Sequence, residues 1–201
     1  MLHKLLLLLL CITGTISANA QQAADTSVKK APKIDYTQIG APMPPMRLIV
    51  CRDTSAKASQ QTPPEERKKR KKTGHDEAPK QILTNEDVDN GANLFVMIFN
   101  PNCSHCQEET ILLEQNIALF KKSKLLLMAS PATKQYMPDF FIFSHFVPNP
   151  AITVGIDSSR FLENIFLYQA LPQINIYDAD RKLIKIFNGD VAMESLKNYI
   201  E

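Results

Sequence analysis

The chain of 201 residues has no tryptophan and no apolar run long enough to cross a membrane as a helix. Its leucine-rich run at 5–12 is far shorter than the roughly 20 residues that a bilayer core of about 30 Å requires. Charges of the two signs nearly balance, with a formal net charge of +2, so composition favours neither nucleic acid nor an anionic surface as a partner. No internal repeat is present.

The first 20 residues have the order of a secretory signal peptide. A short basic segment at 1–4 precedes the leucine-rich run, and small residues ending at Ala20 form an Ala-x-Ala cleavage site. We expect cleavage near Ala20 and a periplasmic or secreted protein; tethering to the membrane through an uncleaved signal is the alternative. Cys11 is not expected to carry a lipid, because leucines precede it where a lipoprotein has small residues.

Two polar segments flank the first predicted strand. Residues 21–45 are polar and then proline-rich, which predicts a flexible linker into a domain at 46–201. Residues 53–80 have no apolar pattern and contain six consecutive cations at 67–72, which predicts a disordered basic insertion on a surface loop. These cations do not indicate nucleic acid, because acidic residues flank them and no aromatic residues interleave them.

The cysteines outside the leader number three, and two of them, Cys103 and Cys106, are separated by Ser104 and His105. An odd number suits one redox pair with a spare thiol better than a structural disulfide framework. The pair follows an apolar stretch at 94–100 and opens a segment with helical periodicity. A Cys-x-x-Cys motif between a strand and a helix is typical of thiol–disulfide chemistry.

A structural zinc site is the main alternative from another class of protein. Such a site usually has four ligands, with a second Cys-x-x-Cys or a His pair, and the chain has neither. Cys51 stands alone on a predicted strand, where we expect a small core residue rather than a third redox partner. We therefore expect no metal ion and no organic cofactor.

The apolar pattern predicts alternating strands and helices. Strands are expected at 46–51, 94–100, 124–129, 151–156, 173–177 and 182–187. Helices are expected at 103–121, 133–145, 158–168 and 191–200, after a short helical turn in which Asp87 completes a capping box with Thr84. This order implies parallel strands with right-handed crossovers and a final antiparallel hairpin. The predicted class is α/β, a central mixed sheet flanked by helices.

Three features of the chain occur together in a known group of proteins. They are the Cys-Ser-His-Cys motif at 103–106 after a buried strand, Glu109 three residues past the second cysteine, and Leu171-Pro172 just before the hairpin. With Gly-Ala-Pro at 40–42, they resemble the thioredoxin fold, and within it the exported TlpA-like or ResA-like thiol–disulfide oxidoreductases, relatives of the AhpC/TSA and redoxin group.

This resemblance implies a thioredoxin-like three-layer fold and exchange with protein thiols or disulfides. Cys103 is expected to be the exposed nucleophile and Cys106 the buried resolving thiol, with a disulfide Cys103–Cys106 in the oxidised protein. Glu109 is expected to exchange a proton with Cys106, and Leu171 and Pro172 to form the substrate groove. A membrane electron donor is a further candidate partner, nucleic acid is not, and we expect a monomer.

The chain departs from the family pattern close to its motif. Asn102 stands where tryptophan is usual, and Thr110 stands where the group often has proline. His105, if protonated, would stabilise the thiolate and make the disulfide more oxidising; an exposed histidine without effect is the alternative. A non-catalytic binding module and a redoxin-type peroxidase are alternative functions. The intact cysteine pair argues against the first, and the missing Pro-x-x-x-Thr/Ser-x-x-Cys context argues against the second.

Overall fold

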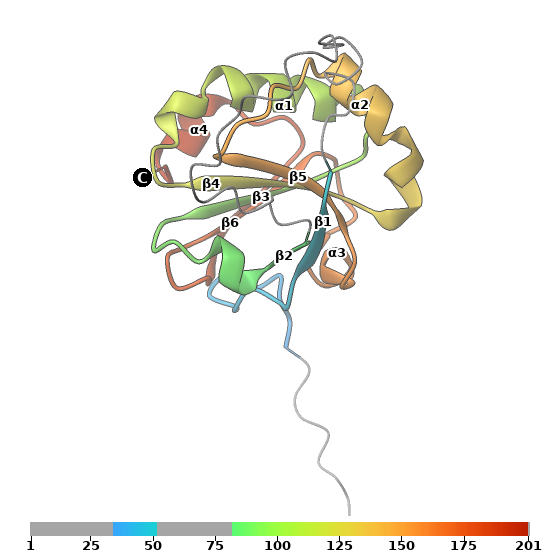
Figure 1. Ribbon diagram of the computed structural model, residues 1–201. Coiled ribbons are helices and arrows are strands. Elements are labelled where there is room, and N and C mark those ends of the chain that lie inside the picture. Colours follow the sequence, from blue (N-terminus) through green and yellow to red (C-terminus); the bar gives the residue numbers. More distant parts are fainter. Residues whose placement is uncertain (1–33, 52–81, 201) are drawn as a thin grey trace, which may run out of the picture. The chain divides into compact units, whose positions relative to one another are not determined.

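A seven-stranded sheet in the order β2-β1-β5-β4-β3-β6-β7 organises the fold (Figure 1). Its strands are β1 (Arg47–Val50), β2 (Ile82–Thr84), β3 (Leu94–Phe99), β4 (Lys124–Ala129), β5 (Ile152–Asp157), β6 (Gln173–Tyr177) and β7 (Leu183–Asn188). Strands β3, β4 and β5 run parallel, and the four other pairings are antiparallel. The predicted mixed sheet is therefore confirmed, whereas β2 was not predicted as a strand.

The computed structural model describes residues 34–51 and 82–200. The predicted signal peptide, the first part of the predicted linker and the basic insertion at 53–80 lie outside the described residues. The rest of the predicted linker is packed against the hairpin: the N–H of Gly40 donates to the Leu183 carbonyl at 2.7 Å, and the N–H of Met43 donates to the Arg181 carbonyl at 2.7 Å. Met43 is also buried, so the packed unit begins before residue 46.

The helices within the described residues are shorter than the sequence predicts. They are α1 (Ser104–Gln115), α2 (Met137–Phe143), α3 (Phe161–Ile165) and α4 (Met193–Lys197), with 3₁₀ segments η3 (Asn85–Val88), η4 (Ile117–Leu119) and η5 (Pro131–Tyr136). The predicted capping box at the start of η3 is present, since Asp87 Oδ2 accepts the Thr84 N–H at 2.8 Å. The predicted helices at 103–121, 133–145, 158–168 and 191–200 are thus wrong in their ends.

Local backbone chemistry explains these shorter helices. Asn116 leaves the helical conformation and its side chain caps the Leu112 carbonyl at 2.8 Å, so α1 ends at Gln115. Pro138 has no N–H to donate four residues back, so the chain before it forms the 3₁₀ segment η5 instead of an α-helix. Arg160 has a left-handed backbone with φ of 64°, and α3 begins only after it.

The order of the parallel strands decides which helices share a face. The chain steps from β3 to β4 to β5 in one direction across the sheet, so right-handed crossovers place α1 and α2 on the same side. One core cluster combines Phe95 and Met97 of β3 with side chains of α1, α2 and α4. A second combines Val96 and Ile98 of β3 with side chains of α3. Figure 1 shows α3 on the opposite side of the sheet from α1, α2 and α4.

Strands β1 and β5 approach closely at Gly155, which gives a test of the sheet. A Cβ atom at Gly155 would lie 2.6 Å from the backbone oxygen of Ile49 and 2.6 Å from the Leu48 side chain. Because that oxygen belongs to the paired strand, it cannot withdraw without disturbing the pairing. We expect Gly155→Ala to lower the free energy of unfolding by about 1–3 kcal/mol, the usual cost of overpacking. Urea denaturation measures this change, and an unaltered midpoint would contradict the contact.

Candidate functional site

The motif lies where β3 passes into α1. Cys103 is the N-cap residue of α1 and has an extended backbone, so the helix begins one residue later than predicted. Its N–H donates to the Asn100 carbonyl at 3.0 Å, and its carbonyl accepts the N–H of Gln107 at 3.1 Å. The side chain of Cys103 is half-buried. It therefore stands beside the backbone N–H groups of a helix start, which have no partners within the helix and favour negative charge.

Cys106 lies one helical turn further on and is completely buried, with 0 % of its surface exposed. It belongs to the core cluster between the sheet and α1, and its thiol faces that of Cys103. Both thiols are free. Burial raises the pKa of the Cys106 thiol, and the neighbouring Cys103 thiol and the charge of Asp190 act in the same direction. The pair thus combines an accessible sulfur with a buried one that holds its proton.

Glu109 is buried on α1 one turn past Cys106, with 3 % of its surface exposed. Its Oε2 accepts the N–H of Val191 at 3.2 Å, and its Oε1 has no hydrogen-bond partner among the described residues. Burial raises the pKa of the Glu109 carboxyl, the hydrogen bond from Val191 opposes this, and the charge of Asp190 adds to it. A pocket of about 310 Å³ beside this carboxyl is lined by Glu108, Glu109, Leu112, Asp190, Val191 and Ala192.

The turn at 189–191 contacts the motif from the other end of the chain. Asp190 Oδ2 lies 3.0 Å from Nδ1 of His105, and the N–H of Val191 reaches Glu109. Gly189 and Asp190 come just before α4, whose N-cap is Ala192. Asp190 is therefore a site residue that sequence analysis missed, and no local pattern marks it.

Leu171 and Pro172 lie beside the end of β3. Gln173 of β6 pairs with Ile98 of β3 in antiparallel register. The two residues before Gln173, Leu171 and Pro172, therefore lie beside the segment where β3 ends and leads into the motif. The Leu171–Pro172 peptide bond is cis. Pro172 is buried, and its carbonyl accepts the N–H of Gly189 at 2.8 Å. The segment Leu171–Pro172, the motif and the turn at 189–191 therefore meet at one end of the sheet.

Comparisons with known proteins find structural relatives only. No family model matches the chain, and no curated protein matches it. A Chlorobium tepidum protein that carries the name of the thiol:disulfide interchange protein DsbE superposes with a TM-score of 0.55 at 13 % identity, covering 81 % of this chain and 94 % of that one. The thioredoxin domain of a thiol-disulfide oxidoreductase from Bacteroides vulgatus has the same TM-score and identity and covers 82 % and 99 %. The fold is thioredoxin-like. At this identity the likeness shows the fold alone.

The remaining candidate residues of the thioredoxin-like domain lie apart or at the surface. Ser104 is exposed in the first turn of α1. Cys51 follows β1 and is half-buried rather than in the core; burial raises the pKa of its thiol, and nearby Lys134 opposes this. Residues 34–51 and 82–200 contain no cluster of three or more His, Cys, Asp or Glu that would suit a metal ion. In the same ranges, every helix is too short or too polar to span a bilayer.

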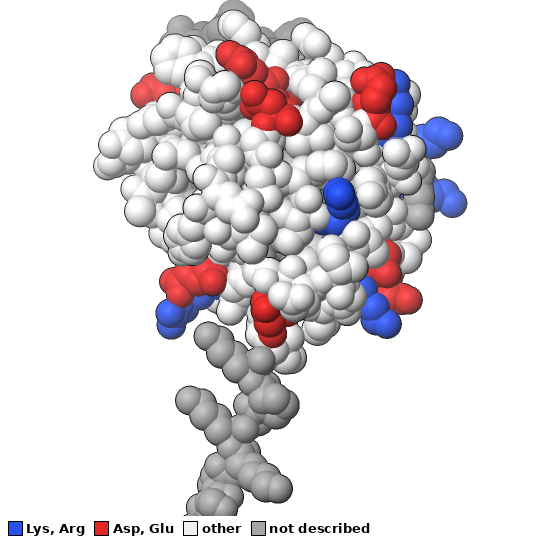
Figure 2. Space-filling view, turned by 180° about the vertical axis from the view of Figure 1, so that it is seen from behind, with Lys and Arg blue, Asp and Glu red and all other residues white. Residues whose placement is uncertain are grey.

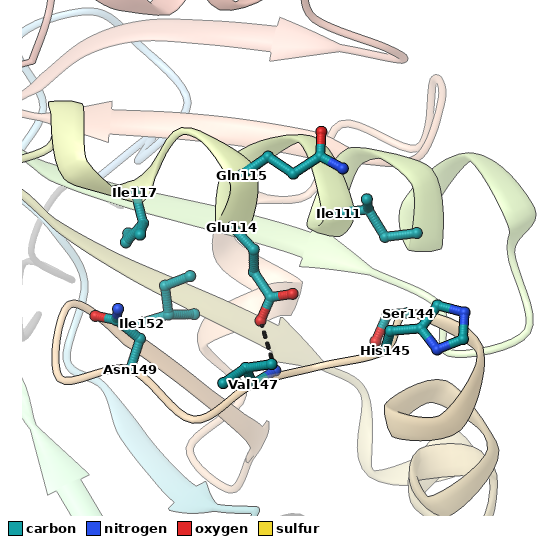
Figure 3. Close-up of a pocket in the computed structure, with 9 residues that line it drawn as sticks. All are labelled: Ile111, Glu114, Gln115, Ile117, Ser144, His145, Val147, Asn149 and Ile152. Carbon is teal, nitrogen blue, oxygen red and sulfur yellow. Dashed lines mark hydrogen bonds between the residues drawn. The ribbon is translucent and has the colours of Figure 1, made fainter.

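A larger pocket of the thioredoxin-like domain, of about 450 Å³, lies along the second half of α1 (Figure 3). Glu114 points from the helix toward the loop after α2, where its Oε1 accepts the N–H of Val147 at 3.0 Å. Burial raises the pKa of the Glu114 carboxyl, and this hydrogen bond opposes it. Neither cysteine of the motif lines this pocket, so it is separate from the site at the start of α1.

Figure 2 shows the side of the molecule that faces away in Figure 1. Most of the described surface there is uncharged, and the Lys, Arg, Asp and Glu side chains stand in small separate groups. A continuous basic patch, which nucleic acid binding requires, is absent from the described residues on this face.

The two cysteines of the motif should differ in reactivity. In the reduced protein we expect iodoacetamide to modify Cys103 roughly tenfold or more faster than Cys106, because Cys106 is buried and its pKa is raised. Mass spectrometry of peptides from a time course measures both rates. In urea the two rates should converge. Equal rates in the folded protein would contradict the burial of Cys106.

Glu109 should make stability depend on pH. Its carboxyl has a raised pKa in the folded protein, so ionising it opposes folding as the pH rises past its ordinary value of about 4.3. Glu109→Gln keeps an acceptor for Val191 but no charge. We expect this variant to have a higher urea midpoint than the wild type at pH 8 and an equal one near pH 3.5.

The exposed neighbour Glu108 provides the matched control for this experiment. Glu108→Gln makes the same charge change on the same helix without a buried carboxyl, so its urea midpoint should follow the wild type at both pH values. A Glu109→Gln midpoint that also follows the wild type throughout would show that the buried carboxylate carries no penalty.

Proposed function

We propose that this protein catalyses thiol–disulfide exchange with protein substrates through Cys103 and Cys106. The observation that carries the proposal is a half-buried thiol at the start of a helix of 12 residues, facing a fully buried thiol one turn on. The thioredoxin-like fold supports it, since solved structures with this fold include proteins named for thiol–disulfide interchange.

The exchange proceeds through a mixed disulfide. The Cys103 thiolate attacks one sulfur of a substrate disulfide, the substrate S–S bond breaks, and the departing sulfur takes up a proton. Cys106 then gives its proton to the Glu109 carboxylate and attacks the sulfur of Cys103, which releases the second substrate thiolate to be protonated in turn. The substrate gains two electrons and the protein ends with a Cys103–Cys106 disulfide. The reverse sequence oxidises a substrate dithiol.

Glu109 is suited to the proton step because, like Cys106, it is buried and has a raised pKa. A thiol as deeply buried as Cys106 does not lose its proton to water directly, and it needs a nearby base. A carboxyl with a raised pKa is a stronger base than an ordinary glutamate, so proton transfer from the thiol is less unfavourable. The pocket beside Glu109 then offers a way for the proton to reach solvent.

The segment at Leu171 and Pro172 is the proposed contact surface for the substrate. Proline has no N–H, so it leaves the strand without a donor at the position nearest the motif, where an extended peptide can pair with the remaining backbone groups. Ser104 and His105 are exposed in the first turn of α1, at the same end of the sheet. A protein substrate that reaches Cys103 would meet these residues.

We propose that the exchange takes place outside the cytoplasm. The signal-peptide pattern at 1–20 supports export to the periplasm or beyond, with an uncleaved signal as the alternative form of attachment. A disulfide can persist in such a compartment. The partners are protein thiols and disulfides, with a membrane electron donor as a further candidate, and the protein acts as a monomer.

Serine variants of the two cysteines test the proposal. With a disulfide-bonded protein such as insulin as the probe, Cys103→Ser should abolish exchange. Cys106→Ser should stop after the first step, because the resolving thiol is missing, and leave a mixed disulfide on Cys103. A covalent adduct on a non-reducing gel that dithiothreitol removes measures this.

Cys51→Ser is the matched control and should leave both exchange and adduct formation unchanged. The reduction potential of the Cys103–Cys106 pair, measured by equilibration with glutathione, then gives the direction of electron flow. Failure of the oxidised wild-type protein to form a Cys103–Cys106 disulfide would overturn the proposal.

A further inference from the structure

The turn at 189–191 makes hydrogen-bond contacts with two side chains of α1. Asp190 lies at hydrogen-bond distance from His105, and the N–H of Val191 donates to Glu109. His105 and Glu109 are four residues apart on α1, so they lie on the same face of the helix. That face is directed toward residues 189–191.

The same turn is hydrogen-bonded to Pro172, just before β6. The N–H of Gly189 donates to the carbonyl of Pro172 at 2.8 Å, and Gly189 has a φ of 78°, which a glycine adopts without strain. The turn at 189–191 therefore links α1 to the strand segment at the proposed substrate surface. A residue in this turn is placed to act on both halves of the exchange site.

We propose that Asp190 is a positioning residue for thiol–disulfide exchange, which orients the ring of His105 at the start of α1 and keeps a negative charge beside Cys106 and Glu109. This inference rests on the proposed exchange function. It assigns Asp190 no contact with the reacting sulfur atoms.

Orientation follows from the chemistry of the contact between His105 and Asp190. A carboxylate only accepts hydrogen bonds, so Nδ1 of His105 carries the hydrogen in this 3.0 Å contact, and in the neutral ring Nε2 is left as the acceptor. The two side chains are 61 % and 62 % exposed. A contact so exposed contributes little to stability, so its effect is the selection of one tautomer and one ring direction.

The charge of Asp190 acts on the two groups of the proton step. Cys106 is faced by the thiol of Cys103, the backbone at Asn100 and Asp190; burial is the main cause of its raised pKa, and the charge of Asp190 adds to it. Glu109 is faced by the N–H of Val191 and by Asp190, which raises its pKa as well. The exposed carboxylate thus helps to hold protons on both buried groups.

The sign of the effect on exchange follows from these directions. Removing the charge of Asp190 lowers the pKa of Cys106, so the resolving thiolate forms at lower pH. A more stable thiolate also stabilises the dithiol form and makes the disulfide more oxidising.

The test compares three variants of the full chain. Asp190→Asn removes the charge and keeps a side chain of similar size, and Asp190→Ala removes both. Glu108→Gln is the control, because it removes one charge from another side chain that lines the same pocket. Reduced protein is mixed with oxidised glutathione in a stopped-flow instrument between about pH 5 and 9; the second phase is the attack by Cys106. Nitrogen-15 spectra of the histidine ring report the tautomer of His105.

We expect Asp190→Asn to move the pH profile of the second phase to lower pH, which raises its rate roughly threefold or more on the acidic side. Asp190→Ala should give the same shift and should also remove the preference of His105 for the tautomer with hydrogen on Nδ1. Glu108→Gln should change neither result. Urea midpoints close to that of the wild type would show that the Asp190 variants are folded.

The inference about Asp190 is wrong if both of its variants keep the pH profile and the tautomer of the wild type. It is also wrong if Glu108→Gln shifts the profile as much as Asp190→Asn does, because the effect would then be one of general charge. A wild-type protein that forms no Cys103–Cys106 disulfide would instead overturn the exchange function, and the role of Asp190 with it.

Discussion

The complete burial of β3 is the constraint on which the rest of the site depends. All six residues of the strand are buried, because a core cluster covers each face and β4 and β6 pair with its two edges. Because β3 is held on both faces and at both edges, the position where it ends is fixed. The start of α1, and with it Cys103, is therefore fixed relative to the sheet. The same pairing with β6 sets Pro172 beside that end. The packing of the sheet therefore positions the start of α1 and Pro172.

Local patterns in the sequence are enough to predict what lies along β3 and directly after it. The buried strand, the motif at a helix start and the proline before the hairpin all depend on neighbours in the chain. The ends of the helices depend on single backbone positions such as Pro138 and Arg160, which a count of apolar residues does not weigh. Asp190 escapes prediction because its contact with His105 joins residues 85 positions apart, and no periodicity records that meeting.

A similar long-range contact holds the hairpin that carries Pro172. Arg181 lies in the turn between β6 and β7 with a left-handed backbone, and its guanidinium donates to the carbonyls of Val88 and Ala92 and to the side chain of Asn90. Sequence analysis identified this position only as part of a turn. Its guanidinium, which has five N–H donors, joins the turn after β6 to the segment before β3. Strands β6 and β3 are therefore also held together at the ends that lie away from the motif.

The pairing of β1 with β2 has a consequence for how the domain can change. Ile49 lies opposite Ile82 in the sheet, so Cys51 and the start of β2, the two described ends of the connection at 52–81, lie at neighbouring points. When the ends of a connection are already held together, doubling its length costs only about 0.6 kcal/mol. Insertions, deletions or a grafted peptide at this position would therefore hardly affect the sheet, which makes it a natural place for the chain to diversify and a practical one for attaching a label.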